Sequence, residues 1–222
     1  MNVTVIGFVR DQPSYLNSHY TQHVKRFATV QSLEAYAEKA MRPSISKRSC
    51  DPEQLFGWLA QHPSVHAVFF PYGRSITPPP CQGDAPKDPF AQLIHCLGIP
   101  ETVQFKPVAN QNSQPGDLAI RAALQLSHEL KREGVRLGKR AKRARTLLCR
   151  EAERRNWMET PYMGVDSRLN RHIRAHFAAA NNRFANRTWG CPWDQIFNPD
   201  TAAQSRIPSA ACLLYTSPSP RD

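Results

Sequence analysis

The pattern of apolar residues near the start of the chain predicts a buried β-strand. Residues 3–9 (VTVIGFV) are almost continuously apolar and rich in β-branched side chains, and the run is too short for a helix. Residues 65–70 (VHAVFF) repeat this pattern and predict a second strand. Strands separated by helical segments favour an α/β fold, so we expect the two strands to lie side by side in one parallel sheet flanked by helices.

The other periodic segments predict helices, which make the C-terminal half helix-rich. Four of these helices are expected to begin after a residue whose side chain caps a helix N-terminus: Ser32, Asp51, Asp88 and Asp166. The predicted helices cover residues 14–26, 33–41, 52–61, 89–97, 114–133 and 167–188. Leu93 and Leu97 are expected to face inward, Gly190 to close the last helix, and residues 73–86, with their three consecutive prolines, to form a loop.

Charge changes this picture in one segment. The formal net charge is +11, and residues 131–155 hold eleven Lys and Arg against three Glu. We expect this segment to continue as a helix to about Asn156, weakened at Gly134 and Gly138, and to be largely exposed, because its charges cannot be buried unpaired. A basic helix face can bind an anionic ligand, nucleic acid or an acidic membrane surface. A solvated helix that binds nothing has the same charge pattern. The charge alone selects no partner.

The cysteines and the apolar runs of the sequence give indications about the cellular compartment of the protein. Once the tail discussed next is set aside, five cysteines remain, scattered and without a CxxC pair, which argues against a disulfide framework and against a zinc ribbon. A reducing, cytoplasmic setting is the simplest interpretation. No apolar run is long enough to cross a bilayer, and no basic-then-apolar signal opens the sequence.

The sequence also predicts where the natural part of the chain begins and ends. Residues 212–222 (CLLYTSPSPRD) match, residue for residue, the translation of a common transposase-adapter read-through, so we expect them to be a sequencing artefact. Met1 is followed at once by an apolar strand, and we expect the gene to begin further upstream. The expected organisation is one domain over residues 1–200, an uncertain tail over 201–211, and the artefact.

The most informative segment is residues 5–26, VIGFVRDQPSYLNSHYTQHVKR. Arg10 ends the first predicted strand, a turn with Pro13 follows, and Ser18 comes eight residues after Arg10, near the start of the next helix. Ligands of open α/β sheets bind beyond the carboxyl ends of the strands. An Arg there offers a fork-shaped contact to phosphate, and a Ser in an early helical turn adds a hydroxyl where the helix dipole favours an anion.

This segment resembles the 3′-phosphate-binding element of sulfotransferases that use PAPS as sulfuryl donor. In that family a strand ends in Arg, a Pro-containing turn follows, and Ser comes eight residues later, often before an aromatic residue. The sequence of this segment is also similar to that of bacterial sulfotransferase-like proteins that modify polysaccharides. The matched residues are Arg10, Gln12, Pro13, Ser18, Tyr20, Gln22, Val24 and Lys25, and three later segments agree in order: Val65–Arg74, Asn110–Ser113 and Phe177–Trp189.

The resemblance implies a partial P-loop-type sulfotransferase fold. The implied activity is transfer of a sulfuryl group from PAPS to a hydroxyl of a carbohydrate or other cell-surface acceptor, without a metal. Arg10 and Ser18 would bind the 3′-phosphate. The family's second cofactor element, a Gly/Thr-rich loop with a Lys or Arg that cradles the 5′-phosphosulfate, does not occur in residues 1–222. We expect it, and the general base, upstream, and we assign no catalytic residue.

Other interpretations stay open. Arg10 and Ser18 also fit an ordinary ion-pairing Arg and a helix-start Ser. A nucleotide-sugar glycosyltransferase would usually carry an acidic metal-binding motif after a strand, and no convincing DxD is present. A nucleic-acid-binding protein would use residues 131–155, which lack interleaved aromatic residues. A metal at His172 and His176, and a nucleophilic Cys191, are less favoured than a solvated helix face and an inert thiol.

Overall fold

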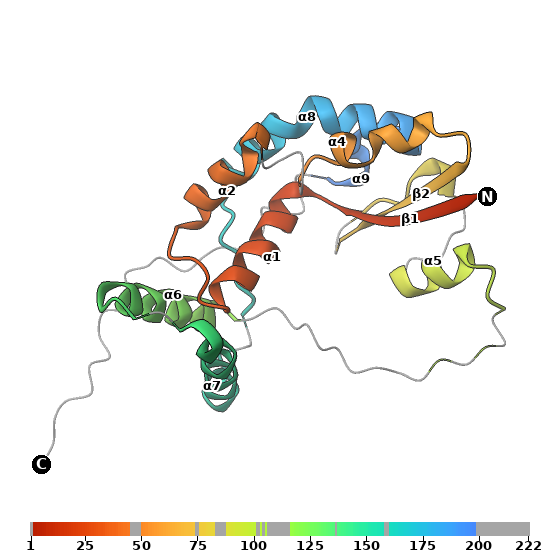
Figure 1. Ribbon diagram of the computed structural model, residues 1–222. Coiled ribbons are helices and arrows are strands. Elements are labelled where there is room, and N and C mark those ends of the chain that lie inside the picture. The colour runs from red at the N-terminus through yellow and green to blue at the C-terminus, as the bar shows by residue number, and fades with distance from the viewer. Residues whose placement is uncertain are drawn as a thin grey trace, which may run out of the picture.

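A computed structural model describes residues 2–44, 50–73, 76–82, 88–100, 103, 105, 116–135, 137–157 and 160–198. Strands β1 (Val3–Arg10) and β2 (Val65–Tyr72) form a parallel two-stranded sheet. Their register pairs Val3 with Val65 and Arg10 with Tyr72, so both strands end at the same edge (Figure 1). The prediction of one parallel sheet is therefore confirmed.

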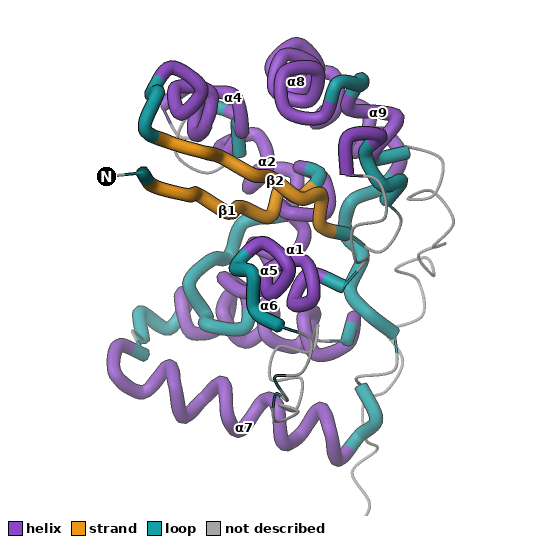
Figure 2. The backbone as a smooth tube through the Cα atoms, turned by 90° about the vertical axis from the view of Figure 1, so that its right-hand side faces the viewer, coloured by secondary structure: helices purple, strands orange, loops and turns teal. Residues whose placement is uncertain are grey.

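Helices lie on both sides of this sheet (Figure 2). In that view α4, α8 and α9 lie above the strands, and α1, α5 and α6 lie below them. The described α-helices are α1 (Gln12–Val24), α2 (Leu33–Met41), α4 (Pro52–Phe56), α5 (Pro89–Cys96), α6 (Asp117–Arg132), α7 (Ala141–Arg154), α8 (Ser167–Trp189) and α9 (Trp193–Ile196). The chain is thus a helix-rich α/β protein, and no helix in its described part is both long and apolar enough to span a membrane.

The four predicted helix starts are confirmed by their caps. The side chains of Ser32, Asp51, Asp88 and Asp166 each accept a hydrogen bond from the backbone N–H three residues later. These bonds satisfy a donor that the helix itself leaves unpaired. At the other end of α8, Gly190 closes the helix with a left-handed φ of 70°, as predicted.

Several predicted boundaries were wrong. The first helix begins at Gln12 instead of Ser14, because Pro13 fits the first turn. The basic segment is broken between α6 and α7, where Gly134 and Gly138 adopt φ values of 67° and 48°. Leu97 lies beyond the end of α5 and is 56% exposed, so it does not face inward.

Smaller differences concern the loops. The helix expected over residues 52–61 is α4 followed by a 3-10 turn over Gly57–Gln61, and a short 3-10 turn over Pro80–Gln82 interrupts the loop expected over residues 73–86. The segment Asn110–Ser113, and Arg74, lie outside the described residues.

Two hydrophobic clusters meet along α8. The first joins α1, α2, α6 and α8, and the second joins the sheet to the C-terminal part of α8 and to α9. The largest fully buried side chains of the first are Tyr20, Phe177, Leu16, Ile120 and Ile173, and the aromatic members of the second are Phe69, Phe184, Trp189, Trp193 and Phe197. Within the second cluster the rings of Trp189, Trp193 and Phe197 pack against one another. Because α8 contributes to both clusters, it joins the sheet to the helical half.

A buried ion pair fastens α8 to the junction between β1 and α1. Arg174 Nη2 lies 2.6 Å from Asp11 Oδ2, and the Trp193 indole N–H donates to Asp11 Oδ1 at 3.2 Å. Arg174 also donates to Asn170 Oδ1 and to the carbonyl of Phe197. Burial raises the pKa of Asp11, and the facing Arg174 guanidinium opposes that rise.

A reciprocal amide pair makes a second link between the same elements. Gln12 Nε2 donates to Asn181 Oδ1 at 2.6 Å, and Asn181 Nδ2 donates to Gln12 Oε1 at 2.9 Å. Gln12 also donates to the carbonyl of Cys50 at 3.1 Å. Both amide side chains are buried. Satisfied polar groups in a low-dielectric setting tolerate few alternative arrangements, so the two links fix how α8 sits on the junction.

Removing one partner of the buried ion pair should be costly. Arg174→Met leaves Asp11 buried without its cation, and we expect the free energy of unfolding to fall by about 3 kcal/mol. Arg171→Met, on an exposed position of the same helix, should change it by no more than about 0.5 kcal/mol. Urea unfolding of both variants measures this. Equal effects at the two positions would show that the ion pair does not fasten α8.

A second ion pair, between α4 and α8, predicts a pH dependence. Arg187 donates to both carboxylate oxygens of Glu53, at 2.9 and 2.5 Å, and these bonds lower the pKa of Glu53. A lowered pKa stabilises the fold above the pKa of the unfolded chain, and the effect disappears as the pH falls. Glu53→Gln should therefore destabilise the protein by about 1 kcal/mol at pH 7. The difference from wild type should vanish towards pH 3 in unfolding scans; a constant difference would contradict the assignment.

Candidate functional site

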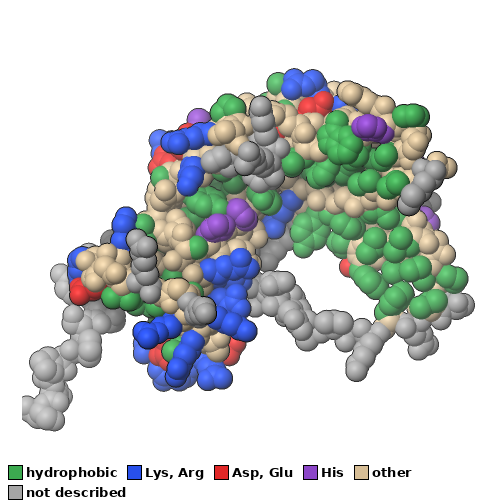
Figure 3. Space-filling view, viewed as in Figure 1, with side chains coloured by type: hydrophobic (Ala, Val, Ile, Leu, Met, Phe, Trp, Pro, Cys, Tyr) green, Lys and Arg blue, Asp and Glu red, His purple; other side chains and the backbone are tan. Residues whose placement is uncertain are grey.

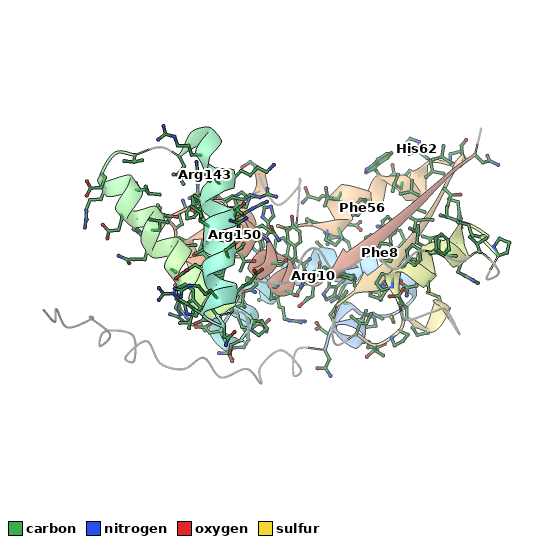
Figure 4. All side chains as sticks on the ribbon, turned by 90° about the horizontal axis from the view of Figure 1, so that it is seen from below. Phe8, Arg10, Phe56, His62, Arg143 and Arg150 are labelled. Carbon is green, nitrogen blue, oxygen red and sulfur yellow. The ribbon has the colours of Figure 1, made fainter. Side chains whose placement is uncertain are left out.

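Arg10 lies at the carboxyl end of β1, next to the end of β2. Its register partner is Tyr72, and its guanidinium carbon lies 5.7 Å from the centre of the Tyr72 ring. Arg10 is half-buried, whereas Tyr72 is 45% exposed. In the view of Figure 4, Arg10 comes between α7 and Phe8. The sequence thus placed Arg10 correctly, at the edge where ligands of open parallel sheets bind.

Ser14 is the serine that contacts Arg10. The Arg10 Nε–H donates to Ser14 Oγ at 2.8 Å. Ser14 is the third residue of α1 and therefore lies in its first turn. Sequence reasoning missed this contact, because the resemblance pointed to Ser18, eight residues after Arg10, as the partner serine. The available signal was Pro13, whose preference for the first helical turn moves the start to Gln12 and brings the Ser14 side chain under Arg10.

The N-terminus of α1 has no side-chain cap. Asp11 occupies the capping position, but its side chain makes no capping hydrogen bond, because Arg174 and Trp193 hold its carboxylate. Pro13 has no N–H to offer. The first N–H groups of the helix and the positive end of its dipole thus lie beside the half-buried Arg10 and Ser14. Helix N-termini in such surroundings are suited to anions.

Ser18 lies two residues further into the helix than the sequence predicts, because α1 begins at Gln12 instead of Ser14. It is the seventh residue of α1 and half-buried. Residues four apart lie on the same helix face, about 6 Å apart along the axis, so Ser14 and Ser18 form a short row of hydroxyl groups that starts at Arg10. The contact of Ser18 with a phosphate therefore stays a prediction.

The other residues that carry the resemblance divide into two groups. Gln12, Tyr20 and Val24 are buried, and the Tyr20 hydroxyl donates to the carbonyl of Gln31 at 2.8 Å. Gln22 and Lys25 are half-buried. Burial lowers the pKa of Lys25, and the nearby Arg145 and Arg26 act in the same direction. The first group builds the core, so the residues left to meet a ligand are Arg10, Ser14, Ser18, Gln22 and Lys25.

The surroundings of His172, His176 and Cys191 also disfavour the alternative chemistry considered for them. His172 Nε2 lies 2.8 Å from Glu38 Oε1, and the His176 ring packs edge-on against Phe177. Burial raises the pKa of the Cys191 thiol, which disfavours the nucleophilic thiolate. Within the described ranges, no group of three or more His, Cys, Asp and Glu side chains is placed to hold a metal ion.

Arg10 is not among the residues that line the two hollows of the surface described next. One, of about 200 Å³, lies between α8 and α9 and is lined by Arg174, Asn181 and Asp194 among others. Arg174 is committed there to Asp11, Asn170 and the Phe197 carbonyl, so it serves the fold. The other, of about 640 Å³, lies between the end of α1 and the α6–α7 connection and is lined by Phe27 and Leu137 among others.

No protein-family model, curated protein or solved structure matches this chain. Three features define the candidate site: the strand end at Arg10, the Arg10–Ser14 hydrogen bond and the start of α1, which has no side-chain cap.

If the Arg10–Ser14 pair serves a ligand, the fold should not depend on it. Both side chains are half-buried and can be hydrated. Ser14→Ala should therefore lower the free energy of unfolding by no more than about 1 kcal/mol, measured in urea. A loss of about 3 kcal/mol, the size expected for an unpaired buried charge, would make the pair a part of the structural framework instead.

Proposed function

We propose that the β1–α1 junction (residues 10–14) and Ser18 bind the 3′-phosphate of PAPS in a sulfotransferase. The enzyme would transfer a sulfuryl group to a hydroxyl of a carbohydrate or other cell-surface acceptor. The observation that carries this proposal is the Arg10–Ser14 pair beside an α-helix start that Asp11 does not cap. Its position at the carboxyl edge of a parallel sheet agrees with a partial P-loop-type sulfotransferase fold.

The chemistry of a phosphate monoester suits these groups. Its oxygens accept only, and the junction offers donors: the Arg10 guanidinium, the Ser14 and Ser18 hydroxyls and the first N–H groups of α1. A charge-assisted bond is worth more than a neutral one, so Arg10 would dominate the affinity. The half-buried setting strengthens each contact relative to open water.

The 3′-phosphate distinguishes PAPS from other adenine nucleotides. A site that binds it selects the donor and fixes the position of the nucleotide without touching the reacting sulfur. Enzymes of this kind accelerate transfer by holding donor and acceptor in line and by stabilising charge on the bridging oxygen. The part of this chain in the reaction is to hold the nucleotide.

Substitutions at the site should alter selectivity more than stability. Arg10→Ala loses a charge-assisted hydrogen bond worth about 1.5–3 kcal/mol, so its PAPS affinity should fall about tenfold or more. Ser18→Ala should lose less. Both variants should also lose discrimination between PAPS and adenosine 5′-phosphosulfate, which lacks the 3′-phosphate. Calorimetric titration of both nucleotides measures this.

Arg171→Ala is the matched control, because it removes one exposed positive charge from α8 and leaves the β1–α1 junction unchanged. It should leave both affinities within about twofold of wild type, a difference of about 0.4 kcal/mol. If Arg10→Ala weakened both nucleotides equally, or neither, Arg10 would be a structural residue and the sulfotransferase proposal would lose its main support.

A further inference from the structure

The exposed side of α7 carries a straight row of arginines. Arg143, Arg150 and Arg154, which we call the α7 row, are all exposed. They are spaced by seven and four residues, so they share one helix face and extend over about 16 Å. Leu147 lies on the same face and is 56% exposed. Figure 3 shows Lys and Arg side chains gathered over this lower part of the molecule, and Figure 4 shows Arg143 and Arg150 along α7.

The opposite side of α7 holds it to the protein. Ala152 is 1% exposed, and Leu148 packs against the first hydrophobic cluster. Figures 1 and 2 place α7 at the periphery, next to α6. The amphipathic helix thus uses small and aliphatic residues to dock and leaves its arginines outside. The sequence prediction of a largely exposed basic helix is confirmed for this segment.

Two arginines of the row are electrostatically unsatisfied. Within the described residues, neither Arg143 nor Arg150 has a carboxylate at ion-pair distance, whereas Arg154 pairs with Glu151 at 2.6 Å. The neighbouring helix α6 differs, because Arg121 pairs with Asp117 and Arg132 with Glu129. In the described part of the chain, the positive charges of Arg143 and Arg150 are therefore not offset by a carboxylate at ion-pair distance.

We propose that the α7 row binds a linear acidic polysaccharide, which is the acceptor of the transfer. The inference rests on the proposed function for the acceptor role, and on the charge of the row for the binding itself. Carboxylate groups along such a polymer would meet the guanidinium groups one after another. The aliphatic surface of Leu147 between them suits the C–H face of a sugar ring.

The arrangement favours a polysaccharide over nucleic acid. Duplex DNA presents phosphates on both sides of a groove, whereas the α7 row is a single line of arginines. At the end of the neighbouring α6, Glu129 and Glu133 both lie at ion-pair distance from Arg132. Single-stranded nucleic acid is usually held by aromatic side chains interleaved with cations. The exposed face of α7 has none, and Trp157, beyond its end, is covered by the Arg155 guanidinium at 5.3 Å.

The test is binding of polygalacturonate oligomers, a carboxylated linear polysaccharide, to the whole chain. Wild type should bind them with an affinity that falls as salt rises. The double variant Arg143→Gln/Arg150→Gln should bind at least about tenfold more weakly, a loss of about 1.4 kcal/mol. The control Arg171→Gln/Arg183→Gln removes the same charge from exposed positions of α8 and should stay within about twofold.

Three outcomes would overturn the proposal: no binding by wild type, equal weakening in both double variants, or equally tight binding of a duplex DNA of matched charge at the same ionic strength. PAPS titration separates the two proposals. Arg143→Gln/Arg150→Gln should keep the preference for PAPS over adenosine 5′-phosphosulfate. If wild type lacked that preference yet bound the polysaccharide through the row, the proposed function would fail and the binding surface would stand.

Discussion

The ion pair between Asp11 and Arg174 is the interaction on which the arrangement of the candidate site depends. Asp11 occupies the capping position of α1, where a carboxylate would ordinarily accept bonds from the first N–H groups of the helix. Arg174 and Trp193 draw that carboxylate towards α8 instead. The same contact that docks α8 therefore leaves the start of α1 without its side-chain cap, directly beside Arg10. Fold and candidate function are coupled at a single residue.

Such a pair is a poor source of net stability. The cost of desolvating two charges offsets most of their attraction, and the pair shows its value mainly when one partner is lost. Its contribution is specificity, which the reciprocal bonds between Gln12 and Asn181 reinforce. Hydrophobic burial supplies the driving force, through two clusters that meet along α8. The polar contacts then determine the position at which α8 crosses the end of β1.

Local signals explain how much of this fold the sequence predicts. The strands and the four capped helices follow from apolar runs and capping residues a few positions apart. The contacts that shape the site join Asp11 to Arg174 and Gln12 to Asn181, more than 160 residues apart in the chain. No local pattern encodes such pairs. Ser14 was missed for a different reason, because the motif that the sequence resembles places its serine eight residues after Arg10, at Ser18.

The α7 row could be predicted from the sequence only in part. Its face was readable from charge and helical periodicity, but the break at Gly134 and Gly138, which separates α7 from α6, depends on backbone geometry. That break separates α7, whose arginines face outward, from α6, whose Arg121 and Arg132 pair with acidic residues of the same helix. In the two proposals, nucleotide and acceptor would be held by separate elements, the first by the β1–α1 junction and the second by a peripheral helix.

The most direct test of the central claim is a ¹⁵N NMR titration with adenosine 3′,5′-bisphosphate, the desulfated form of PAPS. If the β1–α1 junction holds the 3′-phosphate, the signals of the Arg10 Nε–H and of the Ser14 backbone N–H should move with the bisphosphate and stay in place with adenosine 5′-phosphate. Identical shifts with both nucleotides, or shifts confined to the hollow lined by Phe27 and Leu137, would contradict it.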